Sequence, residues 1–284
     1  MTVPRERSTV GLVLVRPSQL LGSEPFYQEL IAGAEGVFGP RGITLLLQVV
    51  TSAADEAATY LRWAEDETVA GVLVVDLDPH DSRVELLVSL GLPAVVVGDP
   101  ATAGSLPAVW TDDASAMNHA VGSLVELGHS VIAHVSGPQG LAHSQIRIAA
   151  LHEAAAASAV AVLEASGDYS EEAGLLATRE LLSARTPPTA IVYDDDLMAI
   201  GGLRAARESG LSVPGDLSIV AWDDSALCQL SEPALTVMGH DVQAIGELTA
   251  SALLDVLAGR AAEQYEAPTA TFLARESVGR PSRR

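Results

Sequence analysis

Lysine is absent from this chain. All 16 cationic side chains are arginine. The chain also has 37 Asp and Glu residues, so its formal net charge is −21. Without lysine, the chain cannot form a lysine Schiff base, link pyridoxal phosphate internally or use the lysine of a P-loop. A surface this acidic repels the phosphate backbone of nucleic acids, so we expect this chain not to bind DNA by itself.

Cysteine and long apolar runs are also scarce. Cys228 is the single cysteine, so an internal disulfide is excluded, which agrees with a reducing compartment. No uncharged apolar stretch reaches the roughly 18 residues that a membrane span needs. Residues 1–7 are short, polar and charged and do not resemble a signal peptide. We therefore expect a cytoplasmic protein that does not enter a membrane.

Signatures of catalysis are missing as well. The sequence contains no G-x-S-x-G elbow and no glycine-rich loop for a dinucleotide or a phosphate. Seven histidines are scattered, and the spacing of His129 and His134 suits no common zinc site, so we interpret both as structural. These absences predict no cofactor, no metal site and no enzymatic activity.

Short apolar runs alternate with amphipathic segments along the whole chain, and this rhythm predicts parallel sheets covered by helices. The 284 residues are enough for two such α/β lobes. Predicted strands cover residues 9–15, 43–50, 71–75, 94–97, 109–110, 131–135, 160–163, 190–193, 217–222, 235–238 and 266–274. Predicted helices cover residues 26–37, 53–66, 81–90, 114–127, 145–157, 170–183, 197–208 and 242–257.

The stretch 189–224 has the pattern of one βαβ unit with acids after both strands. Asp194, Asp195 and Asp196 follow the first strand, and Asp223 and Asp224 follow the second. Parallel strands end at the same edge, where ligands bind open α/β sheets. Such aspartates are often only helix caps or turn residues. We expect Asp196 to cap the next helix, and Asp195 and Asp223 to contact a ligand.

The same stretch carries a family resemblance. It contains Pro188-Thr189-Ala190-Ile191, Met198-Ala199-Ile200-Gly201, Gly210-Leu211-Ser212-Val213-Pro214 and Asp216-Leu217-Ser218-Ile219-Val220, followed by Pro233-Ala234-Leu235-Thr236 and Arg275-Glu276-Ser277. In this order, these motifs resemble the lac-repressor/galactose-repressor family of bacterial transcription regulators. The resemblance runs from about Val10 to the end. One departure is Ala221-Trp222, which replaces the common Gly-Phe.

The resemblance implies two doubly wound Rossmann-like lobes with parallel sheets, joined by a three-stranded hinge, in the manner of type I periplasmic binding proteins. The lobes would be residues 8–136 with 241–265, and 137–239 with 267–284, with the ligand cleft between them. The chain would cross near Ser136, Gly239–Asp241 and Tyr265–Ala267. Family members begin with a helix-turn-helix domain that has no counterpart before Arg7. Operator DNA would therefore bind only through an N-terminal domain that this chain lacks.

The resemblance also implies ligand-binding positions. Phe26 and Tyr27 stand where family members place aromatic or apolar groups against the effector from the N-terminal lobe. Tyr169 stands where an aromatic side chain stacks, and Arg147 where an arginine anchors the ligand. Asp113, Asp195, Asp223 and His240 fall on polar contact positions. The alternative in each case is a structural role. Phe26 would be a core anchor, Arg147 a partner in an ion pair, Tyr169 a loop aromatic and His240 a capping side chain.

This set of side chains suits a neutral ligand with many hydroxyl groups, because carboxylates accept hydrogen bonds from neighbouring hydroxyls and aromatic rings cover a sugar's apolar face. A cationic amino sugar also fits. An anionic sugar phosphate is disfavoured, since one arginine would have to outweigh three carboxylates.

The predicted function is therefore the effector-binding and homodimerisation core of a transcriptional regulator. In this reading, closure of the lobes on a sugar or polyol controls DNA binding by the intact protein. The alternative is the solute-binding protein of a sugar transporter, which would need a secretion signal. An unrecognised enzyme with its active site in the cleft is a third reading.

Overall fold

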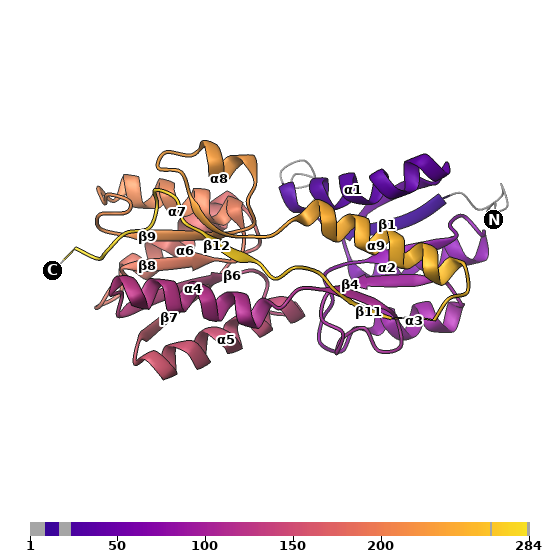
Figure 1. Ribbon diagram of the computed structural model, residues 1–284, viewed down its shortest axis with the longest axis horizontal. Coiled ribbons are helices and arrows are strands. Elements are labelled where there is room, and N and C mark those ends of the chain that lie inside the picture. The colour runs from indigo at the N-terminus through magenta and orange to yellow at the C-terminus, as the bar shows by residue number, and fades with distance from the viewer. Residues whose placement is uncertain (1–8, 17–23, 262, 283–284) are drawn as a thin grey trace. The chain divides into compact units, whose positions relative to one another are not determined.

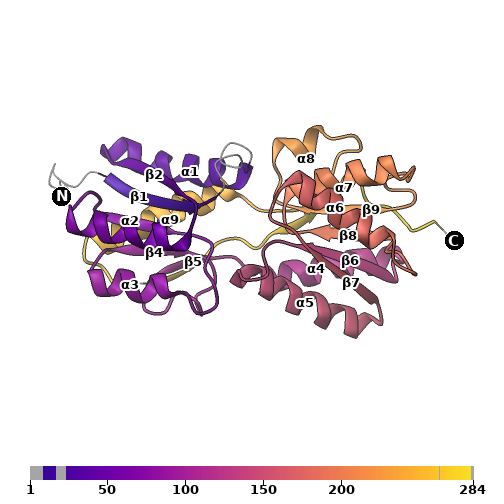
Figure 2. The same ribbon diagram turned by 180° about the vertical axis from the view of Figure 1, so that it is seen from behind.

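The computed structural model describes residues 9–16, 24–261 and 263–282. The chain divides into two compact units, Met1–Thr111 with Asp241–Ala267, and Asp112–His240 with Pro268–Arg284. Each unit contains a six-stranded sheet with helices on both faces (Figures 1 and 2). The predicted α/β fold of two doubly wound lobes is confirmed.

The first sheet is parallel throughout. Its strand order is β11-β5-β4-β3-β1-β2. The strands are β1 (Thr9–Val15), β2 (Thr44–Val50), β3 (Gly71–Val74), β4 (Ala94–Val97), β5 (Ala108–Trp110) and β11 (Gln264–Glu266). Helices α1 (Pro25–Phe38), which runs into the 3-10 turn η1 (Gly39–Arg41), and α9 (Val242–Leu257) share a core on one face, while α2 (Ala53–Glu65) and α3 (Ser82–Leu90) share a core on the other.

The second sheet repeats this plan with one antiparallel edge. Its order is β12-β10-β9-β8-β6-β7, and β12 runs antiparallel to β10. The strands are β6 (Val131–Ser136), β7 (Ala161–Ser166), β8 (Ala190–Tyr193), β9 (Ser218–Trp222), β10 (Thr236–Gly239) and β12 (Thr271–Leu273). Helices α4 (Asp113–Leu127) and α5 (Ala142–Ser158) cover one face, α6 (Glu171–Leu182) and α7 (Asp196–Glu208) cover the other, and α8 (Ala226–Leu230) follows β9.

The buried central strands explain the apolar runs in the sequence. Every residue of β3, β8, β9 and β10 is buried, as expected for parallel strands covered on both faces. In each sheet the chain reverses its winding direction at the first strand, between β1 and β3 and between β6 and β8. Such a switch point places the loops after those strands where ligands commonly bind.

Two expectations about the chain's course are corrected by the structure. The first passage between units lies at Thr111–Asp112 and not near Ser136, because β6 pairs with β7 and β8 and so belongs to the second sheet. The single strand expected at 266–274 is two short strands, β11 and β12, in different sheets. The later passages lie at His240–Asp241 and Ala267–Pro268.

No helix within the described ranges is long and apolar enough to cross a membrane.

Candidate functional site

Polar residues gather at the carboxyl edge of the second sheet. The neighbouring parallel strands β6, β8, β9 and β10 are followed by Gly137, Asp194, Asp223 and His240, respectively. Helix α4 begins at this edge with Asp113, and Arg147 lies in the second turn of α5. Parallel pairing thus brings together residues that lie far apart in the sequence.

Arg147 is the centre of this group. Its Nε donates a hydrogen bond to Asp113 Oδ1 at 2.8 Å, and its Nη1 donates to the backbone oxygen of Asp194 at 3.3 Å. Its guanidinium carbon lies 4.0 Å from the centre of the Trp222 ring, a cation–π contact. Burial lowers the pKa of Arg147, but the charges of Asp113 and Asp194 raise it by more than burial lowers it. The guanidinium therefore stays charged.

Asp194 lies beneath Arg147 with no exposed side-chain surface. His134 Nε2 is 2.8 Å from its Oδ1, and the N–H of Gly137 donates to its Oδ2 at 3.0 Å. Burial opposes ionisation of this carboxyl, whereas His134, Arg147 and the Gly137 N–H hold its pKa well below the usual range. Asp194 is therefore a buried, ionised carboxylate.

Tyr169 lies against the same edge and is 9% exposed. Its hydroxyl is 2.8 Å from His143 Nε2, and its backbone has a φ of +67°. A Cβ atom added to Gly137 would come within 2.2 Å of this hydroxyl. A glycine is therefore needed at position 137 for the tyrosine to pack here.

Asp223 and His240 form the other side of the group. Asp223 Oδ1 and His240 Nδ1 are 3.2 Å apart, an ion pair when the histidine is protonated. Burial raises the pKa of Asp223, although His240 and Arg147 lower it. Asp223 has a φ of +67°, uncommon for an aspartate, and its N–H donates to Met238 O, which fixes this conformation.

Several buried polar atoms at this edge lack a hydrogen-bond partner among the described residues. They are His134 Nδ1, Ser136 Oγ, Ser144 Oγ, Asp196 Oδ2, Trp222 Nε1, Asp223 Oδ1, Asp224 Oδ1 and His240 Nδ1. Buried polar atoms without partners are costly and therefore uncommon. Apart from Asp223 Oδ1 and His240 Nδ1, which face each other at 3.2 Å, these atoms have unused hydrogen-bonding capacity within the described chain.

The capping roles of Asp195 and Asp196 differ from expectation. Asp195 Oδ1 accepts from the N–H of Met198 at 2.9 Å and is the N-cap of α7, whereas Asp196 is the first helical residue. Asp196 is 2% exposed, and burial, reinforced by nearby Asp223, raises its pKa to about 6. The N-cap of α7 is therefore Asp195 and not the predicted Asp196. Ligand contact by Asp195 stays a prediction.

The two aromatic residues predicted for the first unit lie at the start of α1. Tyr27 is 7% exposed, and its hydroxyl donates to Asp76 Oδ2 at 2.5 Å and accepts from Arg16 Nη2 at 2.9 Å. The rings of Phe26 and Tyr27 meet edge to face at 5.3 Å between centroids. Arg16 and Asp76 follow β1 and β3, so this network lies at the switch point of the first sheet. Effector contact by both aromatics stays a prediction.

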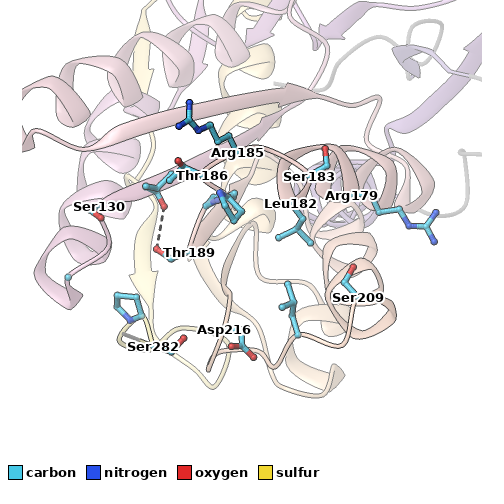
Figure 3. A pocket seen from close by; sticks show the side chains of 16 residues that line it. Ser130, Arg179, Leu182, Ser183, Arg185, Thr186, Thr189, Ser209, Asp216 and Ser282 are labelled. Atoms are coloured by element: carbon cyan, nitrogen blue, oxygen red, sulfur yellow. Dashed lines mark hydrogen bonds between the residues drawn. The ribbon is translucent and has the colours of Figure 1, made fainter. Parts of the chain in front are cut away.

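A cavity of about 840 Å³ lies at the opposite, amino-terminal edge of the second sheet (Figure 3). It is lined mainly by the loop between α6 and β8, the turn before β6 and the tail residues Pro281 and Ser282. The guanidinium groups of Arg179 and Arg185 point away from each other, and Arg179 is paired with Glu208. The cavity therefore has no convergent group of buried charges comparable to that around Arg147.

Comparison with known proteins identifies the family. Residues 121–278 match the family model described as a periplasmic binding protein-like domain. The transcriptional regulator CelR of Thermobifida fusca is 30% identical over 95% of this chain and 81% of its own length, and the repressor CytR of Escherichia coli is 31% identical over 91% and 75%. The chain belongs to the LacI family of transcriptional regulators.

Solved LacI-family structures agree in fold. A regulator from Bifidobacterium animalis matches 97% of this chain and 100% of its own with a TM-score of 0.89 and 31% identity. A complex of CelR with cellobiose matches 97% and 86% with a TM-score of 0.88 and 29% identity. The chain is the effector-binding core of a LacI-family regulator, and the relatives named above are regulators of transcription.

The structure brings together five residues that the sequence singled out: Asp113, Arg147, Tyr169, Asp223 and His240. It adds four that sequence reasoning did not assign to a site: His134, His143, Asp194 and Trp222. Asp194 and Trp222 could have been found from the ends of their strands, where side chains reach the ligand-binding edge. For His143 the sequence offered no signal.

Within the described ranges, no group of His, Cys, Asp and Glu side chains is arranged to hold a metal ion.

Proposed function

We propose that the carboxyl edge of the second sheet binds a neutral sugar or polyol as the effector of this LacI-family regulator. The observation that carries the proposal is the arrangement of Arg147 beside the Asp223–His240 pair. Arg147 is held by Asp113 and Asp194, while Asp223 Oδ1 and His240 Nδ1 lie 3.2 Å from each other and have no further hydrogen-bond partner within the described chain. The edge thus offers a fixed donor next to a carboxylate–imidazole pair that can take further hydrogen bonds.

Charge balance at this edge favours a neutral ligand. Asp113 is paired with Arg147, and Asp194 with both Arg147 and His134. Asp224 is paired with Arg275 at 2.6 Å. A sugar phosphate would meet few uncompensated cations here, while hydroxyl groups could bind both carboxylate and guanidinium. The cellobiose complex of CelR and a ribose-bound LacI-family regulator from Enterococcus faecium, 25% identical, support the sugar class for this chain.

The intact regulator would be a cytoplasmic homodimer whose effector changes the placement of its DNA-binding domains. Symmetric dimers are the commonest soluble assembly, and a two-fold operator requires paired recognition elements. In this proposal the effector is bound and released unchanged, without a cofactor. A ligand can shift the regulator only through a difference in its affinity for two states.

Isothermal titration calorimetry tests this proposal with cellobiose, ribose, sorbitol, glucosamine, a sugar phosphate and a purine. We expect binding of a neutral sugar or polyol. Loss of a charge-assisted hydrogen bond costs about 1.5–3 kcal/mol, so Arg147→Ala or Asp223→Asn should weaken it roughly ten- to a hundredfold. Arg179→Ala at the opposite edge is the matched control and should leave affinity unchanged.

Binding of only the purine or the sugar phosphate would contradict the proposed ligand class. Sugar binding that is indifferent to both Arg147→Ala and Asp223→Asn would contradict the proposed site.

A further inference from the structure

We propose that Asp194 and His134 position Arg147 for the effector without touching the effector themselves. This inference rests on the proposed function of the carboxyl edge, and it assigns a role to two buried residues, one on β6 and one directly after the neighbouring strand β8.

Arg147 has one nitrogen left for a ligand. Nε donates to Asp113, and Nη1 donates to the backbone oxygen of Asp194 and lies 3.5 Å from its Oδ1. The Trp222 ring lies 4.0 Å from the guanidinium carbon, measured to the ring centre. Nη2 has no hydrogen-bond partner among the described residues and carries two N–H donors. The geometry points to Nη2 as the group that binds effector hydroxyls.

The two carboxylates that hold Arg147 differ in accessibility. The Asp113 side chain is 14% exposed, so a ligand hydroxyl could compete for it. The Asp194 side chain is 0% exposed, and both of its oxygens already accept hydrogen bonds within the protein. Asp194 is therefore a counter-charge that stays with Arg147 whether or not an effector is bound. A buried guanidinium without such a partner would be strongly destabilised.

His134 fixes Asp194 in turn. The carboxylate of Asp194 has no hydrogen to give, so His134 Nε2 must donate across the 2.8 Å contact. His134 Nδ1 is buried and without a hydrogen-bond partner in the described chain, so a second N–H there would be unsatisfied. The N–H at Nε2 therefore lies on the Asp194 side of the ring. With the Gly137 N–H on Oδ2, it prevents the carboxylate from turning away from Arg147.

Arginine side-chain NMR on the effector-free protein provides the first test. The Nε–H of Arg147 should exchange slowly with water, because it is bonded to Asp113 and buried. If Asp194 holds the guanidinium, Asp194→Asn should speed that exchange by about tenfold or more, as lost protection would. Unchanged exchange in a folded Asp194→Asn protein would overturn the inference. This readout needs no effector, so it decides the inference even if no sugar binds and the proposed function fails.

A double-mutant cycle measured by calorimetry provides the second test. Asp194→Asn should weaken sugar binding about tenfold in the wild-type background, the effect of losing a hydrogen bond to a charged group. It should have less than about a twofold effect when Arg147 is already alanine, because residues that act through one another are not additive. Equal losses in both backgrounds would show that Asp194 acts independently of Arg147 and would overturn the inference.

Three further variants separate positioning from general stability. Tyr193, the last residue of β8, points to the face of the sheet opposite to that of Asp194, and Tyr193→Phe removes its buried 2.6 Å hydrogen bond to Thr178 of α6. The variant should therefore lower Tm but leave affinity unchanged. His134→Leu removes the donor to Asp194 and should weaken sugar binding. His134→Gln keeps a side-chain N–H and should retain affinity better than His134→Leu. If Tyr193→Phe weakened binding as much as Asp194→Asn, the effect would be one of stability, and the inference would fail.

Discussion

Ionisation of the Asp196 carboxyl group lowers the stability of the folded protein. Its pKa is raised from 3.8 to about 6, mainly by burial, and its Oδ2 has no hydrogen-bond partner in the described chain. An acid with a raised folded-state pKa binds its proton more tightly in the folded protein, so stability falls as pH rises from about 4 to about 6 and stays lower above it. The shift corresponds to a cost on the order of 2–3 kcal/mol at neutral pH.

Asp196→Asn should therefore raise Tm at pH 8 and have little effect near pH 4, as thermal unfolding across pH would show. Asp112 is a control of opposite sign, because its bonds to Ser115 lower its pKa. The stabilising effect of its charge is present at pH 8 and lost as the pH falls through its folded-state pKa, so Asp112→Asn should lower Tm at pH 8 more than near pH 4. An effect of Asp196→Asn that is the same at both pH values would contradict this account.

Sequence reasoning located the acids but not their individual roles. The run of three aspartates after residue 193 predicted a polar edge, and the structure places them at the end of β8. Strand alternation gives Asp194 the same face as Val192, whose core includes α5, and this brings it to Arg147. That assignment requires knowing which helices cover which face, which no local pattern in one sequence reveals.

Close helix pairs are the main packing feature at the level of elements. Helix α1 runs beside α9 (Figure 1), and Cβ atoms added to Gly33 and Gly246 would come within 2.0 Å of Gln243 O and 2.2 Å of Leu30 O, respectively. The backbones therefore touch where side chains would normally separate them. Helices α6 and α7 meet in the same way through Gly174 and Gly201.

We expect Gly33→Ala to destabilise the protein by about 1–3 kcal/mol, because the new methyl group forces α1 away from α9. Gly36 in the same helix is exposed and has no atom within 4 Å of an added Cβ, so Gly36→Ala should stabilise by about 0.5–1 kcal/mol through helix propensity alone. Chemical denaturation of both variants provides the measurement. Equal effects of the two substitutions would show that the close approach does not matter.

Most elements were predictable because apolar runs and helical spacing are local signals. β1, β4, β8 and α9 begin and end where the sequence predicted. The short terminal strands were not predictable: β11 and β12 have three residues each, and their partners β5 and β10 lie far away in the sequence. Three residues carry too little periodicity to separate two strands from one. The five-residue helix α8 was missed for the same reason.

The division into two units could be predicted only in outline. Helix α4 and strand β6 have the same amphipathic and apolar patterns as their counterparts in the first unit, so the sequence could not show which sheet they join. Pairing of β6 with β7 and β8 decides it. Unit boundaries in such folds depend on long-range strand pairing, which local patterns do not encode.

For the whole molecule we predict a homodimer. LacI-family membership and the prevalence of two-fold symmetric assemblies support this prediction. Sedimentation velocity at micromolar concentration should give the mass of two chains, and dilution should reveal the dissociation constant. A monomer alone throughout that range would refute the prediction. Arg147→Ala should sediment like the wild type, because Arg147 is buried within its own unit.

The central claim is that the carboxyl edge of the second sheet binds the effector. A crystal structure of the protein with the sugar that binds most tightly in calorimetry tests it most directly. We predict that the ligand's hydroxyl groups contact Arg147 Nη2 and the carboxylate of Asp223, while Asp194 stays out of contact. A sugar seated instead in the cavity beside Ser130 and Thr186, at the amino-terminal edge of that sheet, would contradict the account.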